Sequence, residues 1–498
     1  MPFLIYPPIG FARIGDSPEM FVGPETIGSR GTELSSGAQL TQYKDSQFRV
    51  RKQAARFHLF QKNADGSVSP AVLPAGAVVT WSVNMANRKD AVARNSGTPP
   101  GPITAGHPLR PVDVPARANR VIQATGNIAS NAGIAAKQTL AGTHAGSAVT
   151  LGELRVDAQG KLLVLGGSMI SAAHPGTTAL TGDFYKNPDW HDDVSDGPVT
   201  ATIKFADGHN ETPEGAWVVV TPPDFAPGAQ PIVTLFDEIL QLALDQHWSG
   251  PGTILPARPS FTKDIYPIIR NARSLGWVHM DRAQPGSANS EPNWGQISQN
   301  FAQLSAAGIA NHQLRVNTRD LIKNVTSLLS NYSIPPRKSQ VLTDWVNGNF
   351  DSDWTGVPNP ATVPTAVSLI RSALEGAVGQ GFFPGIEAGR ILTDPSIYKQ
   401  PFDFRLTAGV LRAGDVSALM AQPWQADFLK CSGNWWPSQR PDIAQQPNGS
   451  FQFWARPPQT HAGLVQNVKR FGMIVVNVDA NGVQISSTEQ GRDPSLTT

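Results

Sequence analysis

The sequence contains almost no cysteine. Cys431 is the single one among 498 residues, which excludes an intramolecular disulfide framework and a thiolate-rich metal site. Charged residues are also scarce, at 16% of the chain, and Lys plus Arg (40) nearly balance Asp plus Glu (39). Because a nucleic-acid surface needs clustered positive side chains, and no long basic run occurs, we expect no nucleic-acid partner.

Long apolar runs are missing as well. No stretch approaches the roughly 18 apolar residues of a transmembrane helix, so we expect no membrane span. The opening MPFLIYPPIGFARIGD lacks the basic region and apolar stretch of a signal peptide, and Pro2, Pro7 and Pro8 interrupt any helix there. We therefore expect a soluble, cytoplasmic protein.

Metal and nucleotide motifs are equally absent. The ten histidines show no paired metal-ligand spacing, and neither a phosphate-binding loop nor a G-x-S-x-G elbow occurs. The segment WHDDVSDGP offers His191, Asp192, Asp193 and Asp196, but it lacks the alternating oxygen ligands and distal Glu of a calcium loop. An acidic turn that caps a strand is the favoured interpretation, and no metal site is expected.

Glycine (46) and proline (42) are abundant, which favours turns and short strands over long helices. Short β-branched segments bounded by Gly or Pro predict strands, and apolar residues that recur at three and four predict helices. The predicted strands are 76–85, 160–167, 197–205, 215–223 and 470–478; the predicted helices are 231–248, 263–275, 296–307, 318–331 and 364–378. Stretches 95–118 and 140–150 are expected to be long loops.

These segments predict an α+β fold. A β-rich region, 1–230, is followed by a helical and loop-rich region, 231–498, whose irregular C-terminal part carries the unusual residues. The two regions are read as two domains or as one continuous body. Irregular loops on a rigid scaffold are where binding and catalytic groups concentrate.

The lone cysteine stands in an unusual setting, ADFLKCSGNWWPSQRP, four residues after Asp427 and close to Trp435 and Trp436. Cys431 can be a buried apolar filler, the commonest role of a free cysteine, or a thiolate nucleophile beside a histidine. A third role is a thioether to an oxidised tryptophan, which needs a tryptophan within reach and a carboxylate to remove protons. The local residues leave all three readings open.

Long stretches of the chain resemble the LodA-like quinoproteins, the family of lysine ε-oxidase and glycine oxidase. They occur in one order along nearly the whole chain, which makes the resemblance far more specific than any single motif. The stretches are IYPPIGFARIGDSPEMFVGPE (5–25), LGELRVDAQGKLLVLGG (151–167), NPDWHDDVSDGPVTATI (187–203), AWVVVTPPDFAPG (216–228), FTKDIYPIIR (261–270), GFFPGIEAG (381–389) and MAQPWQADFLKC with WWPSQRPD (420–442).

The resemblance implies a self-derived cysteine tryptophylquinone. Cys431 in QADFLKC would be the thioether cysteine, and Asp427 the carboxylate needed to form the cross-link. Trp454, in FWARPP, matches the family's quinone tryptophan, which lies downstream of the WWP segment. Trp435 and Trp436 are expected to be packing walls around the cofactor.

The family's activity implies a quinoprotein oxidase that deaminates a small primary amine or amino acid with O2, releasing ammonia and hydrogen peroxide. The chain has no flavin-binding fingerprint, so the resemblance implies a separate flavoprotein that matures the tryptophan, and relatives imply a homo-oligomer. His461 is a candidate for proton transfer, with a surface histidine in a turn as the alternative. His191 stands where an aromatic residue of the substrate channel is expected. The alternative function is a member that forms no quinone and acts as a binding or structural protein.

Overall fold

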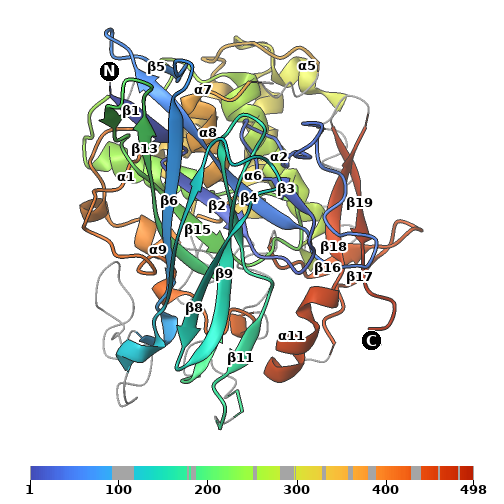
Figure 1. Ribbon diagram of the computed structural model, residues 1–498. Helices are drawn as coiled ribbons and strands as arrows, with labels where there is room; N and C mark the ends of the chain where they lie inside the picture. Colours follow the sequence, from blue (N-terminus) through green and yellow to red (C-terminus); the bar gives the residue numbers. More distant parts are fainter. Residues whose placement is uncertain are drawn as a thin grey trace.

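The computed structural model shows an α+β protein, as the sequence predicts (Figure 1). It describes residues 2–91, 117–176, 179–180, 187–250, 255–280, 297, 299–327, 333–356, 363–379, 389–427, 439–457, 460–479 and 483–496.

The N-terminal region is built around one 13-stranded sheet with the path β7-β6-β13-β15-β2-β4-β10-β9-β8. Most neighbours are antiparallel, but β15 pairs with β2 in parallel. The strands of this region are β1 (Phe3–Tyr6), β2 (Ile9–Arg13), β3 (Met20–Val22), β4 (Lys52–Lys62), β5 (Val68–Pro70), β6 (Val78–Asn87), β7 (Ile122–Ala129), β8 (Gln138–His144), β9 (Ser147–Val156), β10 (Leu162–Gly166), β11 (Ser171–Ala173), β12 (Trp190–Asp192), β13 (Ser195–Lys204), β14 (Asn210–Glu211) and β15 (Ala216–Thr221).

The sheet curls until its two end strands, β7 and β8, approach each other. A Cβ atom at Gly126 of β7 would lie 2.5 Å from the side chain of Leu140 in β8, and one at Gly142 of β8 would lie 2.6 Å from the carbonyl oxygen of Gln123. Because only glycine tolerates such a close approach, these two glycines allow the ends of the sheet to meet.

Helices fill the middle of the chain and pack behind the sheet in Figure 1. Helix α1 begins with a capping box, in which Thr234 and Asp237 each bind the other's main-chain N–H. The helical elements are η1 (Lys89–Ala91), η2 (Arg117–Arg120), α1 (Leu235–Asp245), η4 (Phe261–Ile265), α2 (Tyr266–Ser274), η5 (Leu275–Trp277), α5 (Phe301–Leu304), α6 (His312–Ser327), α7 (Pro336–Val346), α8 (Ala366–Glu375), α9 (Gly389–Leu392), η6 (Pro395–Ile397), η7 (Ser417–Leu419), α11 (His461–Asn467) and η8 (Val468–Arg470).

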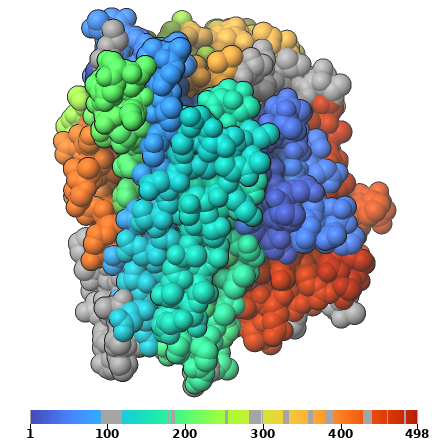
Figure 2. Space-filling view, in the orientation of Figure 1, coloured from blue at the N-terminus to red at the C-terminus, as the bar shows by residue number. Residues whose placement is uncertain are grey.

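The C-terminal part adds two short hairpins, β16 (Ile443–Gln445) with β17 (Phe451–Phe453) and β18 (Met473–Val478) with β19 (Gln484–Gln490). The first fifty residues hold the second hairpin and its flanks, since Lys44 Nζ donates to the carbonyl oxygens of Phe471 at 2.7 Å and Gly491 at 2.9 Å. Figure 2 shows the N-terminal residues in blue packed directly against the C-terminal ones in red.

One large apolar cluster runs through both halves of the chain. It contains Val218 of the sheet, Ile268 of α2, Trp345 of α7, and Trp454 and Ile474 of the C-terminal part. Burial of this shared surface stabilises the halves against each other. The domain boundary at residue 230 stays a prediction.

The loop predicted at 140–150 is wrong. Residues there form the antiparallel hairpin β8–β9, closed by Ala145 and Gly146, whose φ angles are 47° and 91°. Two adjacent residues with positive φ are typical of a tight hairpin turn, so Gly and Thr in this stretch mark a turn between strands and not a long loop. Most of the other predicted loop, 95–118, lies outside the described residues. Among the helices that the structure describes, none has the length and apolar character needed to cross a membrane.

Candidate functional site

Trp454 lies directly after β17 and is buried, with 3% of its surface exposed. Its indole Nε1 donates to the carbonyl oxygen of Gly472 at 3.1 Å, and its main-chain N donates to the carbonyl oxygen of Asp442 at 2.8 Å. The ring packs against Phe225 and Phe471 at centroid distances of 5.4 and 5.5 Å. Two aromatic walls and a hydrogen bond on its only polar atom fix the position of the indole.

The groups that hold the Trp454 indole come from different parts of the chain. Phe225 belongs to the loop after β15, and its main chain binds Gln439 and Ile474 through hydrogen bonds of 3.1 and 2.8 Å. A Cβ atom at Gly472 would lie 2.3 Å from the carboxylate of Glu489, so a larger residue where the indole N–H is received would displace the Glu489 side chain. The pocket of Trp454 is therefore assembled from both halves of the protein.

Asp427 is fully buried and is joined to the same region through Arg440. The Arg440 guanidinium donates from Nη1 to the carbonyl oxygen of Asp427 at 2.9 Å. Two residues after Arg440, the carbonyl oxygen of Asp442 receives the main-chain N–H of Trp454. The segment 439–442 thus connects the predicted carboxylate to the predicted quinone tryptophan.

Three of the predicted site residues, Cys431, Trp435 and Trp436, lie outside the described residues. The neighbouring chain ends, Asp427 and Gln439, are both described and both buried. Cys431 is four residues from the first of them.

A set of ionisable groups that the sequence analysis does not predict lies beside Trp454. Burial raises the pKa of Asp442, while the charges of His279 and Arg440 oppose that rise. Burial and the charge of Arg440 lower the pKa of Arg456 to about 10. Perturbed ionisable groups near a buried aromatic residue mark a candidate site. The signal was present in the motif WWPSQRPD, where Arg440 and Asp442 follow two tryptophans.

His461, the predicted proton-transfer residue, is the first residue of α11 and follows the N-cap Thr460. Its side chain is buried, with 6% exposed, so the alternative of a surface histidine in a turn is wrong. Helix α11 leads through η8 to Phe471, the ring that covers Trp454. A role for His461 in proton transfer stays a prediction.

His191 is buried in β12, where its ring lies 4.8 Å from that of His144. Burial, followed by the charge of His144, lowers the pKa of His191 to about 4, so the ring is neutral at pH 7. The β11–β12 hairpin also holds the chain that leads to Asp427, because Gln422 Nε2 donates to the carbonyl oxygen of Trp190 at 2.7 Å. The place of His191 in a substrate channel stays a prediction.

The acidic segment predicted as a turn that caps a strand belongs largely to two strands, since Asp192 ends β12 and Asp196 lies in β13, and Asp192, Asp193 and Asp196 are all buried. Asp192 forms an ion pair with Lys89 at 2.6 Å. Asp196 caps the chain after residue 414, accepting hydrogen bonds from Ser417 N and Oγ at 2.7 and 2.6 Å. These carboxylates fix C-terminal segments against the sheet.

Asp193 makes stability depend on pH. Burial raises its pKa from 3.8 to about 7, so its stabilising contribution is complete below pH 3.8 and is lost as the pH rises through about 7. Asp193→Asn can still accept the N–H of Ile170. As the pH rises from 5 to 8, the free energy of unfolding of wild type should fall by about 2–4 kcal/mol more than that of the variant. Urea unfolding at both pH values measures this. Asp320→Asn on the surface is the control, and an identical pH dependence in Asp193→Asn and wild type contradicts the assignment.

Two family models match the chain. The model described as L-Lysine epsilon oxidase N-terminal matches residues 6–220, and that described as L-lysine epsilon oxidase C-terminal domain matches residues 323–454. The chain belongs to the LodA-like family. The second match ends at Trp454, and it includes Asp427, Cys431 and the segment 439–442.

Comparison with a known protein and its crystal structures gives the same family. The L-lysine 6-oxidase of Marinomonas mediterranea is 25% identical over 534 aligned residues, which cover 87% of this chain and 71% of that protein. The crystal structure of the L-Lys ε-oxidase from the same organism has a TM-score of 0.72 at 20% identity, and the structure of its Schiff base intermediate with L-Lys has 0.74 at 19%. Each covers 99% of this chain and 95% of the other. The two proteins share one fold over nearly the whole of both chains.

Proposed function

We propose that the protein is a cysteine tryptophylquinone-dependent oxidase of a small primary amine or amino acid, which uses O2 and releases ammonia and hydrogen peroxide. Family membership supports the reaction class. The observation that carries the proposal is the buried Trp454, whose indole is fixed by Gly472, Phe225 and Phe471 and connected to Asp427 through the segment 439–442.

The described residues fit such a group. A quinone on the indole would supply an electrophilic carbonyl and accept the two electrons of amine oxidation. The hydrogen bond to Gly472 uses the pyrrole N–H of Trp454, so the six-membered part of the indole makes no hydrogen bond that would block its oxidation. Only 3% of the Trp454 surface is exposed, which keeps bulk water from the ring. Cys431, by its place four residues after Asp427, would supply the thioether sulfur.

The side chains of this region have distinct tasks in the proposal. Asp427 would accept protons from the thiol and the ring while the cross-link forms, and Arg440 holds its main chain in place. His461 is proposed to transfer protons during turnover. Trp435 and Trp436 are proposed as walls around the cofactor.

Maturation is proposed to need a separate flavoprotein that introduces oxygen into Trp454. The protein made without this partner is expected to fold and to stay colourless. A homo-oligomeric state, by analogy with relatives, belongs to the same proposal.

Amine-dependent oxygen uptake tests the proposed reaction. Protein co-expressed with its flavoprotein partner should consume O2 and release ammonia and peroxide with at least one amine from a panel of amino acids, diamines and monoamines. Protein made without the partner is the control and should be inactive. A fully cross-linked protein that oxidises no amine would overturn the proposed activity.

His191 is proposed to influence amine preference. Replacing His191 with Phe or Tyr changes the size and polarity of a neutral ring in the hairpin that holds the chain before Asp427. We expect the ratio of kcat/KM between two amines to change about tenfold, the effect of about one methylene group in a pocket. His209→Phe, at an exposed histidine, is the matched control. Unchanged ratios would remove His191 from the channel.

A further inference from the structure

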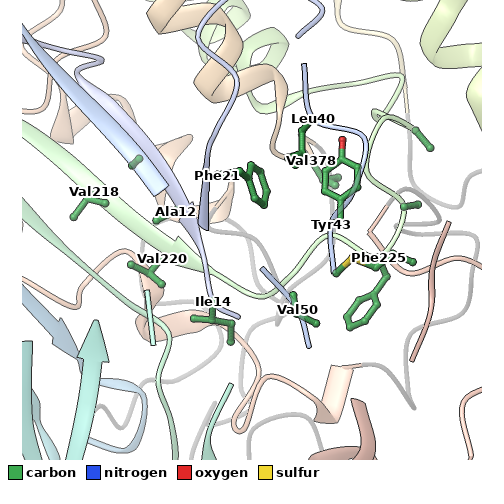
Figure 3. Close-up of a cluster of buried hydrophobic side chains, with 14 of the residues drawn as sticks. Ala12, Ile14, Phe21, Leu40, Tyr43, Val50, Val218, Val220, Phe225 and Val378 are labelled. Atoms are coloured by element: carbon green, nitrogen blue, oxygen red, sulfur yellow. The ribbon is translucent and has the colours of Figure 1, made fainter. Parts of the chain in front are cut away.

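A cavity of about 290 Å³ lies beside the candidate site, a volume suited to a small organic molecule. Part of its wall is apolar and comes from Ile14, Phe21, Tyr43 and Val50, which Figure 3 shows with their side chains gathered in one region. The lining also includes residues of α2 and of the loop 223–231.

Two arginines from distant parts of the chain, Arg30 and Arg270, line this cavity. Arg30 Nη1 donates to the carbonyl oxygen of Val476 in β18. Arg270 Nη2 donates to side-chain oxygens of Gln230 at 2.5 Å and Asn271 at 3.1 Å. All of these partners are neutral groups.

Within the part of the chain that the structure describes, no carboxylate forms an ion pair with either Arg30 or Arg270. Burial lowers the pKa of both guanidinium groups; for Arg270 the charges of Tyr266 and Glu375 oppose that shift, and the charge of Arg30 adds to it. The cavity's own carboxylates have other partners: Glu25 binds Arg56, and Asp224 accepts a main-chain N–H. The carboxylate that acts on Arg270, Glu375, is itself ion-paired with Arg371. Two positive charges that line one cavity without an ion pair of their own favour the binding of an anion between them.

Two glycines with positive φ make room for these side chains. A Cβ atom at Gly28 would lie 2.9 Å from Nη1 of Arg270, and one at Gly228 would lie 3.0 Å from Nε of Arg30. The loops therefore pass close to the two guanidinium groups.

The cavity reaches the surroundings of Trp454. Its lining includes Met473 and Gln439, which are adjacent in sequence to Gly472 and Arg440. Strand β18 connects the two places, since Gly472 receives the indole N–H and Val476 receives Arg30. At about 3.3 Å per residue these carbonyl groups are roughly 13 Å apart. A molecule that reaches from one to the other needs a spacer between its ends.

We propose that Arg30 and Arg270 bind the carboxylate of a small amino-carboxylic acid in this cavity, with its terminal amine directed toward Trp454. The fate of the amine rests on the proposed oxidase function, whereas carboxylate binding does not. A guanidinium pair suits a carboxylate because each group can donate two parallel hydrogen bonds. On this basis an amine separated from its carboxylate by several carbons is preferred to glycine.

Calorimetric titration of the full-length protein made without its flavoprotein partner tests binding apart from catalysis. We expect 6-aminohexanoate to bind and hexylamine, which lacks the carboxylate, to bind at least about tenfold more weakly. Arg30→Gln and Arg270→Gln should each weaken the binding of 6-aminohexanoate by about tenfold or more, and Arg270→Lys should recover part of the lost affinity. Arg319→Gln, on α6 and paired with Asp320, is the control, and circular dichroism checks folding.

Equal binding of the two ligands, binding that neither arginine variant changes, or binding of inorganic phosphate alone would overturn the proposal. The matured protein separates this result from the proposed function. If binding depends on the arginines but no amine is oxidised, the carboxylate site is supported and the oxidase function is contradicted. If amine oxidation is unchanged in both Arg30→Gln and Arg270→Gln, the oxidase function is supported and the carboxylate site is contradicted.

Discussion

Trp454→Phe is expected to abolish the quinone and all amine oxidation while the protein still folds. Phenylalanine keeps an aromatic ring between Phe225 and Phe471 but has no indole to oxygenate or cross-link. The lost hydrogen bond to Gly472 and the smaller ring should lower the free energy of unfolding by about 1–3 kcal/mol. Visible absorbance, peroxide release and urea unfolding of the co-expressed variant measure these effects.

Trp81→Phe is the matched control. Trp81 lies in β6, is 1% exposed, and donates from Nε1 to the carbonyl oxygen of Gly160 at 3.0 Å, just as Trp454 does to Gly472. Both variants should lose similar stability, but Trp81→Phe should keep the chromophore. A coloured, active Trp454→Phe variant would assign the quinone to another of the twelve tryptophans.

Asp427→Asn is expected to stop maturation. The amide keeps the shape of the side chain in its fully buried position but cannot accept protons from the thiol and the ring. Loss of a positioned base slows proton transfer by about 10² to 10⁴-fold. Most of the co-expressed variant should therefore retain an alkylatable Cys431 and an unmodified mass, as measured by mass spectrometry after iodoacetamide treatment in denaturant.

Asp193→Asn is a control for removing a buried carboxylate, since Asp193 is also buried but lies between β12 and β13. It should mature normally. Complete cross-linking in Asp427→Asn would show that another group, such as Asp442, removes the protons.

The sequence predicts the regular elements well where local composition decides them. The β-branched runs became β6, β10, β13, β15 and β18 within a few residues of their expected limits. Helices α1 and α8 also follow their apolar spacing, and both carry a capping Thr. The apolar spacing does not predict helix α7, and the Gly and Thr content of the hairpin β8–β9 predicts a loop because it resembles that of irregular chain.

The site was predictable only in part. Trp454 and Asp427 could be named because family motifs carry them. The groups that fix them could not, because Phe225 and Gly472 reach Trp454 from different segments and nothing local marks their contact. The pairing of Arg30 with Arg270, 240 positions apart in the sequence, is likewise set by packing of the two halves.

The intact mass of the protein co-expressed with its flavoprotein partner, with peptide mapping, tests the central claim most directly. The account predicts a gain of two oxygen atoms and a loss of four hydrogen atoms, with the peptides that contain Cys431 and Trp454 joined. An unmodified mass with an alkylatable Cys431, despite an active partner, would contradict it.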